Sequence, residues 1–306
     1  MNKLVHTGYG SAFNELFINN NTIIKQSKTE YGNFKIKKEI LFFKYIIDNS
    51  VTFPIPHIYE FNEHSYKMQY LQTHIPLYKC FSDFFPNTQV NILNKIYTHL
   101  HTLHKSSNMS LHKNDFSVLL FDETNTKIRK RYLEIIPLLS NYTNITHVNG
   151  IRVKSFDTIL DIIHTKVNKY IDAQKEYNLV PIHGDCQFNN ILFRTEDDIV
   201  FIDPRGYFGN KEVYGLSEYD FAKVKFALSG YDIFDNMEIN SLDIQDGNLT
   251  LPKIHLTDIN TLFTDNDITS ILTISIWLGN AHCFKNNIPK AIFSFYYALY
   301  LATQYL

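Results

Sequence analysis

Apolar residues are arranged differently in the first seventy residues and in the rest of the 306-residue chain. The early part has short apolar runs rich in β-branched and aromatic residues, a pattern that predicts strands bounded by turns. These strands are expected at residues 5–13, 15–18, 22–25, 57–61 and 65–71. Apolar residues spaced three and four apart predict helices at residues 33–48, 88–106, 126–139, 156–175, 268–284 and 288–305. Residues 107–125 are expected to be a loop.

The segment 181–206, PIHGDCQFNNILFRTEDDIVFIDPRG, predicts a β-hairpin. Its two apolar runs, separated by polar turn residues, lie at residues 191–193 and 199–202. Asp185 and Asn190 precede the first run, and Asp203 follows the second. Because a hairpin brings these strand ends together, the three side chains are expected to lie at one mouth.

Two carboxylates and an amide oxygen in a small volume are costly to desolvate unless a cation lies between them. Hard divalent cations prefer oxygen ligands of this kind. Kinases use such a set for phosphoryl transfer: one Asp orients the acceptor hydroxyl, while an Asn and a second Asp hold metal ions against the phosphates. The alternative is a surface hairpin in which Asp and Asn only form turns.

The motif His183-Gly184-Asp185, followed by Asn190 and by a strand that ends in Asp203, resembles the aminoglycoside phosphotransferase and choline kinase superfamily. This superfamily is the small-molecule branch of the protein-kinase-like fold. The resemblance implies that Asp185 is the catalytic base and that Asn190 and Asp203 bind Mg²⁺ next to ATP.

Two further motifs, DPRG at residues 203–206 and YDFAK at residues 219–223, are similar to a narrower group. Its members are phosphotransferases associated with capsular and surface polysaccharide biosynthesis. The resemblance implies a bilobal α+β fold. A small N-lobe, residues 1–72, would contain an antiparallel sheet and one helix, and a larger, mainly helical C-lobe, residues 73–306, would contain the catalytic β-hairpin.

Lys25 ends an apolar strand and is followed by a predicted helix. In the resembled fold, a lysine at this place reaches the phosphates and is held by a glutamate of the next helix. Glu39 is the expected partner, and Glu30 is the fallback. An exposed pair between Glu39 and Lys35, four residues apart, is the alternative without a role in binding.

Other nucleotide contacts are expected from the backbone. Gly8, Gly10 and Ser11 are small enough to let backbone amides approach a triphosphate, although glycines in a β-turn are also ordinary. A hinge is placed at residues 69–73, where the backbone near Gln69 and Leu71 would meet the edge of an adenine ring.

Three residues are candidates for binding the acceptor. Arg205 follows the predicted metal ligand and either steadies Asp185, contacts substrate or forms an ordinary salt bridge. Asn280 and His282 belong to the best candidate wall, with a hydrogen-bonded core histidine as the alternative for His282. Asp220 is expected to tie the catalytic loop to the following helix, a structural role.

Composition narrows the function classes. A formal charge of −2, from 29 Lys and Arg against 31 Asp and Glu, does not favour a nucleic-acid partner. Three cysteines without CxxC spacing favour a reducing compartment, and Cys186 is interpreted as a packing residue. We expect no secretion signal and no transmembrane segment, and therefore a cytoplasmic protein whose oligomeric state stays open.

Two segments carry alternatives. His99, His101 and His104 suggest a metal site, but a packed helix explains them better because no acid or cysteine completes a ligand set. Residues 236–262 break the regular pattern and form either an irregular excursion or a small hairpin near residues 248–251.

The sequence thus predicts an ATP- and Mg²⁺-dependent kinase that phosphorylates a hydroxyl of a small metabolite. A sugar, polyol or amino alcohol used in surface glycan synthesis is favoured by the resemblance. The alternatives are a choline or ethanolamine kinase, an aminoglycoside kinase, and a kinase-like nucleotide-binding or scaffold protein without turnover.

Overall fold

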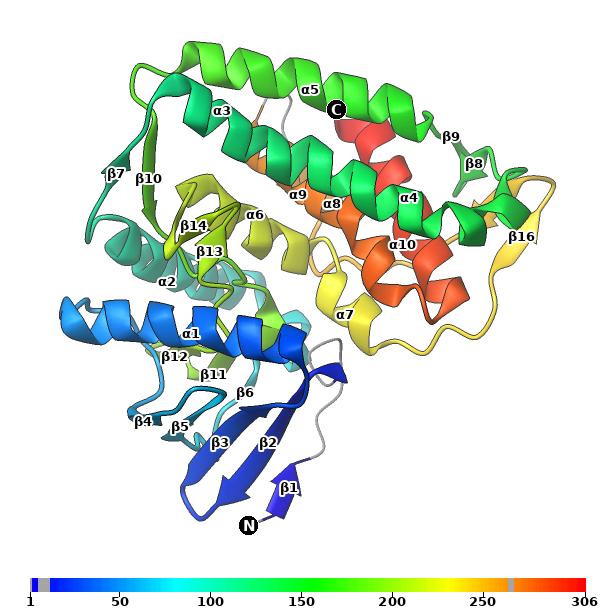
Figure 1. The fold of residues 1–306 in the computed structure, drawn as a ribbon. Helices are drawn as coiled ribbons and strands as arrows, with labels where there is room; N and C mark the ends of the chain where they lie inside the picture. Colours follow the sequence, from blue (N-terminus) through cyan, green and yellow to red (C-terminus); the bar gives the residue numbers. More distant parts are fainter. Residues whose placement is uncertain (1, 5–11, 264–266) are drawn as a thin grey trace. The chain divides into compact units, whose positions relative to one another are not determined.

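The structure is a computed structural model that describes residues 2–4, 12–263 and 267–306 (Figure 1). The chain divides into two compact units. The first contains Met1–Ser110, Asn178–Ala227 and Tyr231–Asn236, and the second contains Leu111–Tyr177, Leu228–Gly230 and Met237–Leu306. The predicted lobe boundary at residue 72 falls inside the first unit and stays a prediction.

A five-stranded antiparallel sheet begins the first unit. Its strands, in spatial order, are β1 (Asn2–Leu4), β2 (Asn14–Asn19), β3 (Thr22–Ser27), β5 (Ser65–Gln69) and β4 (Ile58–Phe61). Asn20, with φ of 53°, forms the turn between β2 and β3. Four of the five predicted segments are therefore strands, while most of the segment 5–13 lies outside the described residues.

Helix α1 (Glu30–Asp48) lies against this sheet (Figure 1). It begins three residues earlier than predicted because Thr29 caps it, its hydroxyl accepting a hydrogen bond from the Gly32 amide at 3.0 Å. Ile36 and Phe43 are fully buried on its inner face, whereas Phe34 and Ile47 are exposed. Phe43 contacts the Tyr66 ring of β5, with ring centroids 5.3 Å apart.

The first unit also contains the predicted hairpin. β11 (Ile191–Thr195) and β12 (Asp198–Phe201) pair in antiparallel register, and β6 (Ile75–Pro76) adds a third strand. Small sheets and helices complete the unit: β7 (Met109–Ser110), β10 (Asn178–Pro181), β13 (Tyr207–Phe208), β14 (Lys211–Glu212), β15 (Tyr214–Gly215), α2 (Pro86–His104), α6 (Ser217–Leu228) and α7 (Tyr231–Asn236). The last residue of α6 belongs to the second unit.

The second unit is mainly helical. Its helices are α3 (Lys113–Phe121), α4 (Lys127–Leu139), α5 (Phe156–Ala173), α8 (Ile259–Leu262), α9 (Ile268–Asn280) and α10 (Ile288–Tyr305). The core contains Trp277 on α9, which is fully buried and whose indole N–H donates to the Ser229 hydroxyl at 2.8 Å. No helix among the described residues is long and apolar enough to cross a membrane.

Two segments, residues 107–125 and 236–262, test expectations from the sequence. The prediction of a loop over residues 107–125 was wrong because α3 buries Phe116, Leu119 and Leu120 at helical spacing, a pattern too short to stand out. A hairpin does form in the region 236–262, as β16 (Asp243–Gln245) and β17 (Asn248–Thr250). β17 also pairs in parallel with β8 (His147–Val148), which pairs with β9 (Ile151–Arg152).

Candidate functional site

Lys25 on β3, Glu39 on α1 and Tyr66 on β5 form a buried polar cluster. Lys25 Nζ lies 2.9 Å from Glu39 Oε2, and the Tyr66 hydroxyl donates to the same oxygen at 2.7 Å. Burial would lower the pKa of Lys25, but Asp203 and Glu39 outweigh it and raise that pKa. Burial raises the pKa of Glu39, against the effect of Lys25. The expected Lys25–Glu39 pair is confirmed, whereas Glu30 is exposed at the start of α1.

Asp203 joins this cluster from the end of the hairpin. One of its carboxylate oxygens lies 2.9 Å from Lys25 Nζ, and its side chain is 38% exposed. Its backbone has a φ of 55°, a left-handed conformation that is uncommon for residues other than glycine. Local strain of this kind persists where the surroundings fix the backbone, and it gathers at functional sites.

Asp185 and Asn190 are in direct contact. The Asn190 amide nitrogen donates to the Asp185 backbone carbonyl and to Asp185 Oδ2, both at 3.0 Å. This use of the nitrogen leaves the amide oxygen as the Asn190 atom suited to a cation. The main-chain carbonyl of Asn190 accepts a hydrogen bond from the Ile202 amide at 3.0 Å, and Ile202 directly precedes Asp203. The contact between Asp185 and Asn190 is therefore observed, and Asp203 follows the end of β12, which pairs with the start of β11. The convergence of all three side chains and their catalytic and metal-binding roles stay predictions.

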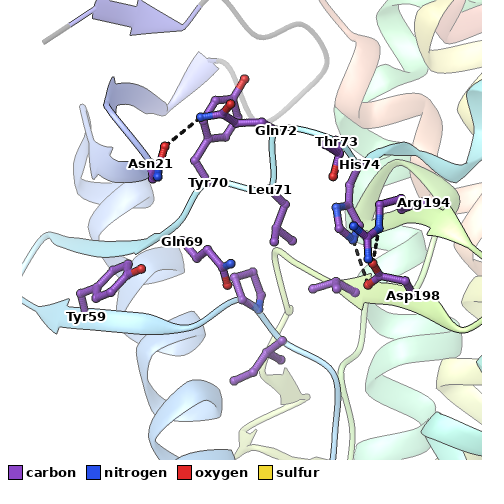
Figure 2. Close-up of a pocket in the computed structure, with 13 residues that line it drawn as sticks. Asn21, Tyr59, Gln69, Tyr70, Leu71, Gln72, Thr73, His74, Arg194 and Asp198 are labelled. Atoms are coloured by element: carbon purple, nitrogen blue, oxygen red, sulfur yellow. Dashed lines mark hydrogen bonds and ion pairs between the residues drawn. The ribbon is translucent and has the colours of Figure 1, made fainter.

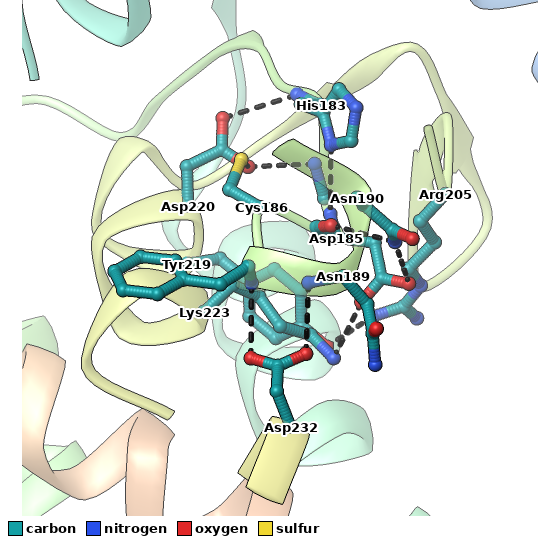
Figure 3. A network of polar contacts seen from close by, with 12 residues as sticks. His183, Asp185, Cys186, Asn189, Asn190, Arg205, Tyr219, Asp220, Lys223 and Asp232 are labelled. Carbon is teal, nitrogen blue, oxygen red and sulfur yellow. Dashed lines mark hydrogen bonds and ion pairs between the residues drawn. The ribbon is translucent and has the colours of Figure 1, made fainter. Parts of the chain in front are cut away.

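Lys223 on α6 pairs with Asp185, a contact that the sequence did not suggest. Lys223 Nζ lies 2.9 Å from Asp185 Oδ1 (Figure 3). Burial would raise the pKa of Asp185, but Lys223 outweighs it and holds that pKa below its usual value. The carboxylate is therefore a weak base that is well oriented.

Asp220 fixes the backbone of the loop at residues 183–190 (Figure 3). Its carboxylate is fully buried and accepts from the amides of His183 at 3.1 Å and Gly184 at 2.6 Å. It also contacts the His104 imidazole at 2.9 Å and the Cys186 thiol at 3.4 Å. The structural role expected of Asp220 is confirmed, and His104 is part of this packing. Burial raises the pKa of the Cys186 thiol well above its usual value, as suits a packing residue.

His183 is a second fixed point. Its ring is fully buried, its Nε2 donates to the Ile202 carbonyl at 3.0 Å, and its Nδ1 accepts from the Asp185 amide at 3.3 Å. Burial lowers the pKa of His183, so the neutral ring fits both contacts. It therefore links the loop before Asp185 to the strand that ends at Asp203.

Asp232 on α7 holds the other end of the loop, a role that sequence reasoning missed. Its two carboxylate oxygens accept from the amides of Phe188 at 3.0 Å and Asn189 at 2.9 Å (Figure 3). Burial raises the pKa of Asp232 to about 7, against the effect of these amides. No motif marks this residue, because its role depends on how α7 packs.

The Arg205 side chain is buried and contacts two aromatic rings. Its guanidinium carbon is 4.3 Å from the Tyr207 ring centre and 5.1 Å from that of Tyr219, and its Nη1 donates to the Tyr219 hydroxyl at 2.5 Å. Gly184, with φ of 77°, leaves room for it, since an added Cβ would lie 2.9 Å from Arg205 Cβ. A contact of Arg205 with substrate stays a prediction.

The predicted hinge borders a pocket of about 590 Å³ in the first unit (Figure 2). Gln69 and Leu71 line it, together with His74, Arg194 and Asp198. Asp198 is held by His74 at 3.0 Å and Arg194 at 2.5 Å. The lining residues do not include Lys25 or Asp203. The nucleotide role of the hinge stays a prediction.

The remaining predicted residues lie elsewhere. Asn280 is buried in the second unit, and its amide nitrogen donates to the Ser294 hydroxyl at 3.1 Å. His282, in the same unit, pairs with Glu134 at 2.8 Å. These contacts give both side chains structural partners, and an acceptor role for either stays a prediction. Gly8, Gly10 and Ser11 lie outside the described residues.

The oxygen donors of Asp203 and Asn190 fit a metal ion only if other ligands complete its coordination shell. Across the part of the chain that the structure describes, no group of three or more His, Cys, Asp or Glu side chains is arranged to hold a metal ion. One carboxylate from Asp203 and one amide oxygen from Asn190 are too few for Mg²⁺, which prefers six oxygen ligands. Mg²⁺ at this place would need phosphate oxygens and water to complete its shell.

The fold is shared with small-molecule kinases. A glucosamine kinase structure has a TM-score of 0.55 and 12% identity, covering 95% of this chain and 76% of that chain. A choline/ethanolamine kinase family protein from Mesorhizobium loti has a TM-score of 0.54 and 12% identity, covering 98% and 87%. The GDP complex of aminoglycoside 2'-phosphotransferase-IIIa has a TM-score of 0.51 and 11% identity, covering 99% and 90%. The sequence matches no family model and no curated protein.

Proposed function

We propose that this protein is a small-molecule kinase that transfers the γ-phosphoryl group of ATP to a hydroxyl of a metabolite. The observation that carries the proposal is the grouping of Asp185, Asn190 and Asp203 at the end of one hairpin, with the Lys25–Glu39 pair on the Asp203 side. The shared fold supports it, because the similar solved structures include glucosamine, choline/ethanolamine and aminoglycoside kinases.

Each residue then has one task. Lys25 contacts the phosphates, and Glu39 keeps its ammonium in place. Asn190 and Asp203 would hold Mg²⁺, which neutralises charge on the phosphate oxygens when bound. Asp185 orients the acceptor hydroxyl. The acceptor oxygen bonds to the γ-phosphorus, and the bond from phosphorus to the β–γ bridging oxygen breaks with its electron pair leaving on ADP. The acceptor proton passes to Asp185.

The acceptor is proposed to be a sugar, polyol or amino alcohol destined for a surface glycan. The DPRG and YDFAK motifs support this choice through their likeness to the polysaccharide-associated group. A kinase-like protein that binds nucleotide without turnover is the rival, and the complete Asp185, Asn190 and Asp203 set speaks against it.

A transfer assay tests the proposal. Purified protein is incubated with Mg-ATP, or with Mg-GTP in a parallel series, and with sugars, polyols and amino alcohols, and ADP or GDP formation is followed. We expect nucleotide-dependent transfer that falls about 10²–10⁴-fold in Asp185→Asn. The same variant should keep its Mg-ATP affinity in a thermal-shift titration. Full turnover by Asp185→Asn would refute the base assignment, and binding without turnover by the wild type would favour the rival.

A further inference from the structure

Helix α6 presents two charged side chains to the catalytic loop, one turn apart. Asp220 and Lys223 are three positions apart and therefore lie on the same face of the helix. Asp220 accepts from the loop amides of His183 and Gly184. Lys223 instead reaches a side chain, that of Asp185. Asp220 therefore fixes the backbone of the loop, and Lys223 holds the side chain of Asp185, the proposed base.

Both carboxylate oxygens of Asp185 have a donor. Lys223 Nζ lies 2.9 Å from Oδ1, and the Asn190 amide nitrogen lies 3.0 Å from Oδ2. Two donors from opposite sides fix the rotation of the carboxylate plane. The Lys223 side chain is only 12% exposed, and its Nζ lies 5.1 Å from the centre of the Phe226 ring. Burying a lysine ammonium is costly unless an opposite charge pairs with it, and the pairing partner here is Asp185.

The loop does not need Lys223 to keep its shape. Asp220 holds the amides at its beginning, and Asp232 holds the amides of Phe188 and Asn189 at its end. A purely structural ion pair would add little to these two anchors. Lys223 instead acts on the side chain of Asp185, which it holds together with Asn190.

We propose that Lys223 is a positioning residue that keeps the Asp185 carboxylate aimed at the acceptor hydroxyl during phosphoryl transfer. This inference rests on the proposed function. In a loose transition state the protein contributes mainly positioning, so a fixed orientation of Asp185 is worth more than a high basicity.

Other charges also act on Asp185, and the test must separate them. Lys35 on α1 and the His183 ring lower its pKa together with Lys223, and the Asp232 carboxylate lies near enough to interact with it. Arg205 acts on Lys223. These groups are unchanged in Lys223 variants, so a difference between variant and wild type reports Lys223 alone.

The experiment compares Lys223→Gln and Lys223→Arg with the wild type, and uses Lys225→Gln on the same helix as the matched control. ADP formation from Mg-ATP is measured with water and with a mixture of sugars, polyols and amino alcohols as acceptors, and the folded fraction of each variant is determined by urea denaturation. We expect kcat to fall about 100-fold in Lys223→Gln, the loss expected of a misplaced group. The KM for ATP should stay within about twofold, and Lys223→Arg should recover most of the rate.

Three results would overturn the inference. A loss of kcat that only follows the unfolded fraction, without recovery in Lys223→Arg, would make Lys223 structural. A raised KM for ATP with unchanged kcat would make it a nucleotide ligand. An equal loss in Lys225→Gln would make the effect unspecific. A wild-type protein that neither binds Mg-ATP nor forms ADP would instead refute the proposed function, and the inference would fall with it.

Discussion

The ammonium of Lys25 lies 2.9 Å from a carboxylate oxygen of Asp203, although 178 positions separate the two residues, as the difference 203 − 25 gives. The same ammonium holds Glu39 at 2.9 Å. The two carboxylates differ in their surroundings, because the Glu39 side chain is 3% exposed and that of Asp203 is 38% exposed. Glu39 is therefore the buried partner of Lys25, and Asp203 is the more exposed partner, to which the proposed function assigns the metal.

The exposed partner provides the first prediction. Asp203→Asn removes the charge but tolerates the left-handed backbone at this position, because Asn adopts that conformation more readily than most residues. We expect Mg-ATP affinity to fall about 10–100-fold, the equivalent of roughly 1.5–3 kcal/mol for a hydrogen bond to a charged group. Calorimetric titration with Mg-ATP measures the effect. Asp197→Asn, in the same hairpin and 83% exposed in its pair with Lys95, is the control. Wild-type affinity in Asp203→Asn would contradict the metal assignment.

The buried partner provides the second prediction. Glu39→Gln keeps an oxygen for the Tyr66 hydroxyl but removes the charge that holds Lys25. We expect about 1–3 kcal/mol of lost stability, because the buried ammonium keeps only Asp203 as an anionic partner. The KM for ATP should rise about 10-fold.

Glu30→Gln is the matched control for that variant, since Glu30 is exposed at the start of the same helix. It should leave the urea midpoint and the KM for ATP unchanged. Equal effects in the two variants would mean that the Lys25–Glu39 contact has no special role.

Asp220 supports the third prediction. Asp220→Ala removes the acceptor for two buried amides and the His104 ring, and Asp220→Asn turns an amide N–H group against one of these donors. We expect either variant to lose about 3–5 kcal/mol, as when one partner of a buried charged network is removed. Urea denaturation measures this loss. Glu218→Gln, two positions earlier on α6, should change the midpoint little, and a similar midpoint in all three variants would show that Asp220 is not an anchor.

The sequence was informative where chemistry is concentrated in one short segment. Asp185, Asn190 and Asp203 lie within nineteen positions, as the count from 185 to 203 gives, and the hairpin pattern alone predicts their convergence. The Lys25–Glu39 pair followed from a strand followed by a helix, together with the resemblance. Local pattern is enough in these cases because the elements that carry the residues are neighbours in the chain.

The sequence was uninformative where tertiary packing decides. Asp232 and Lys223 act on the loop from helices that come 30 or more positions after Asp185, and nothing in their own spacing marks them. Helix α3 was missed because its three buried residues form too short a pattern. The start of α1 was missed because the cap at Thr29 lies outside the apolar run that defined the helix.

His183 provides the last prediction, which concerns pH. Its ring is fully buried, and burial lowers its pKa below the usual value of about 6.5. At pH values between the pKa of His183 in the folded protein and about 6.5, the unfolded chain binds more protons than the folded protein. The contribution of the neutral His183 to the free energy of unfolding is therefore complete above about pH 6.5 and is lost as the pH falls through the folded pKa. His183→Gln keeps a donor and an acceptor but does not titrate. Urea denaturation at pH 4.5–7.5 should therefore give a shallower slope for the variant, by up to about 1.4 kcal/mol per pH unit. His99, His101 and His255, whose pKa values are also lowered by burial, cancel in the difference. Parallel slopes in the two proteins would mean that His183 is protonated in the folded state.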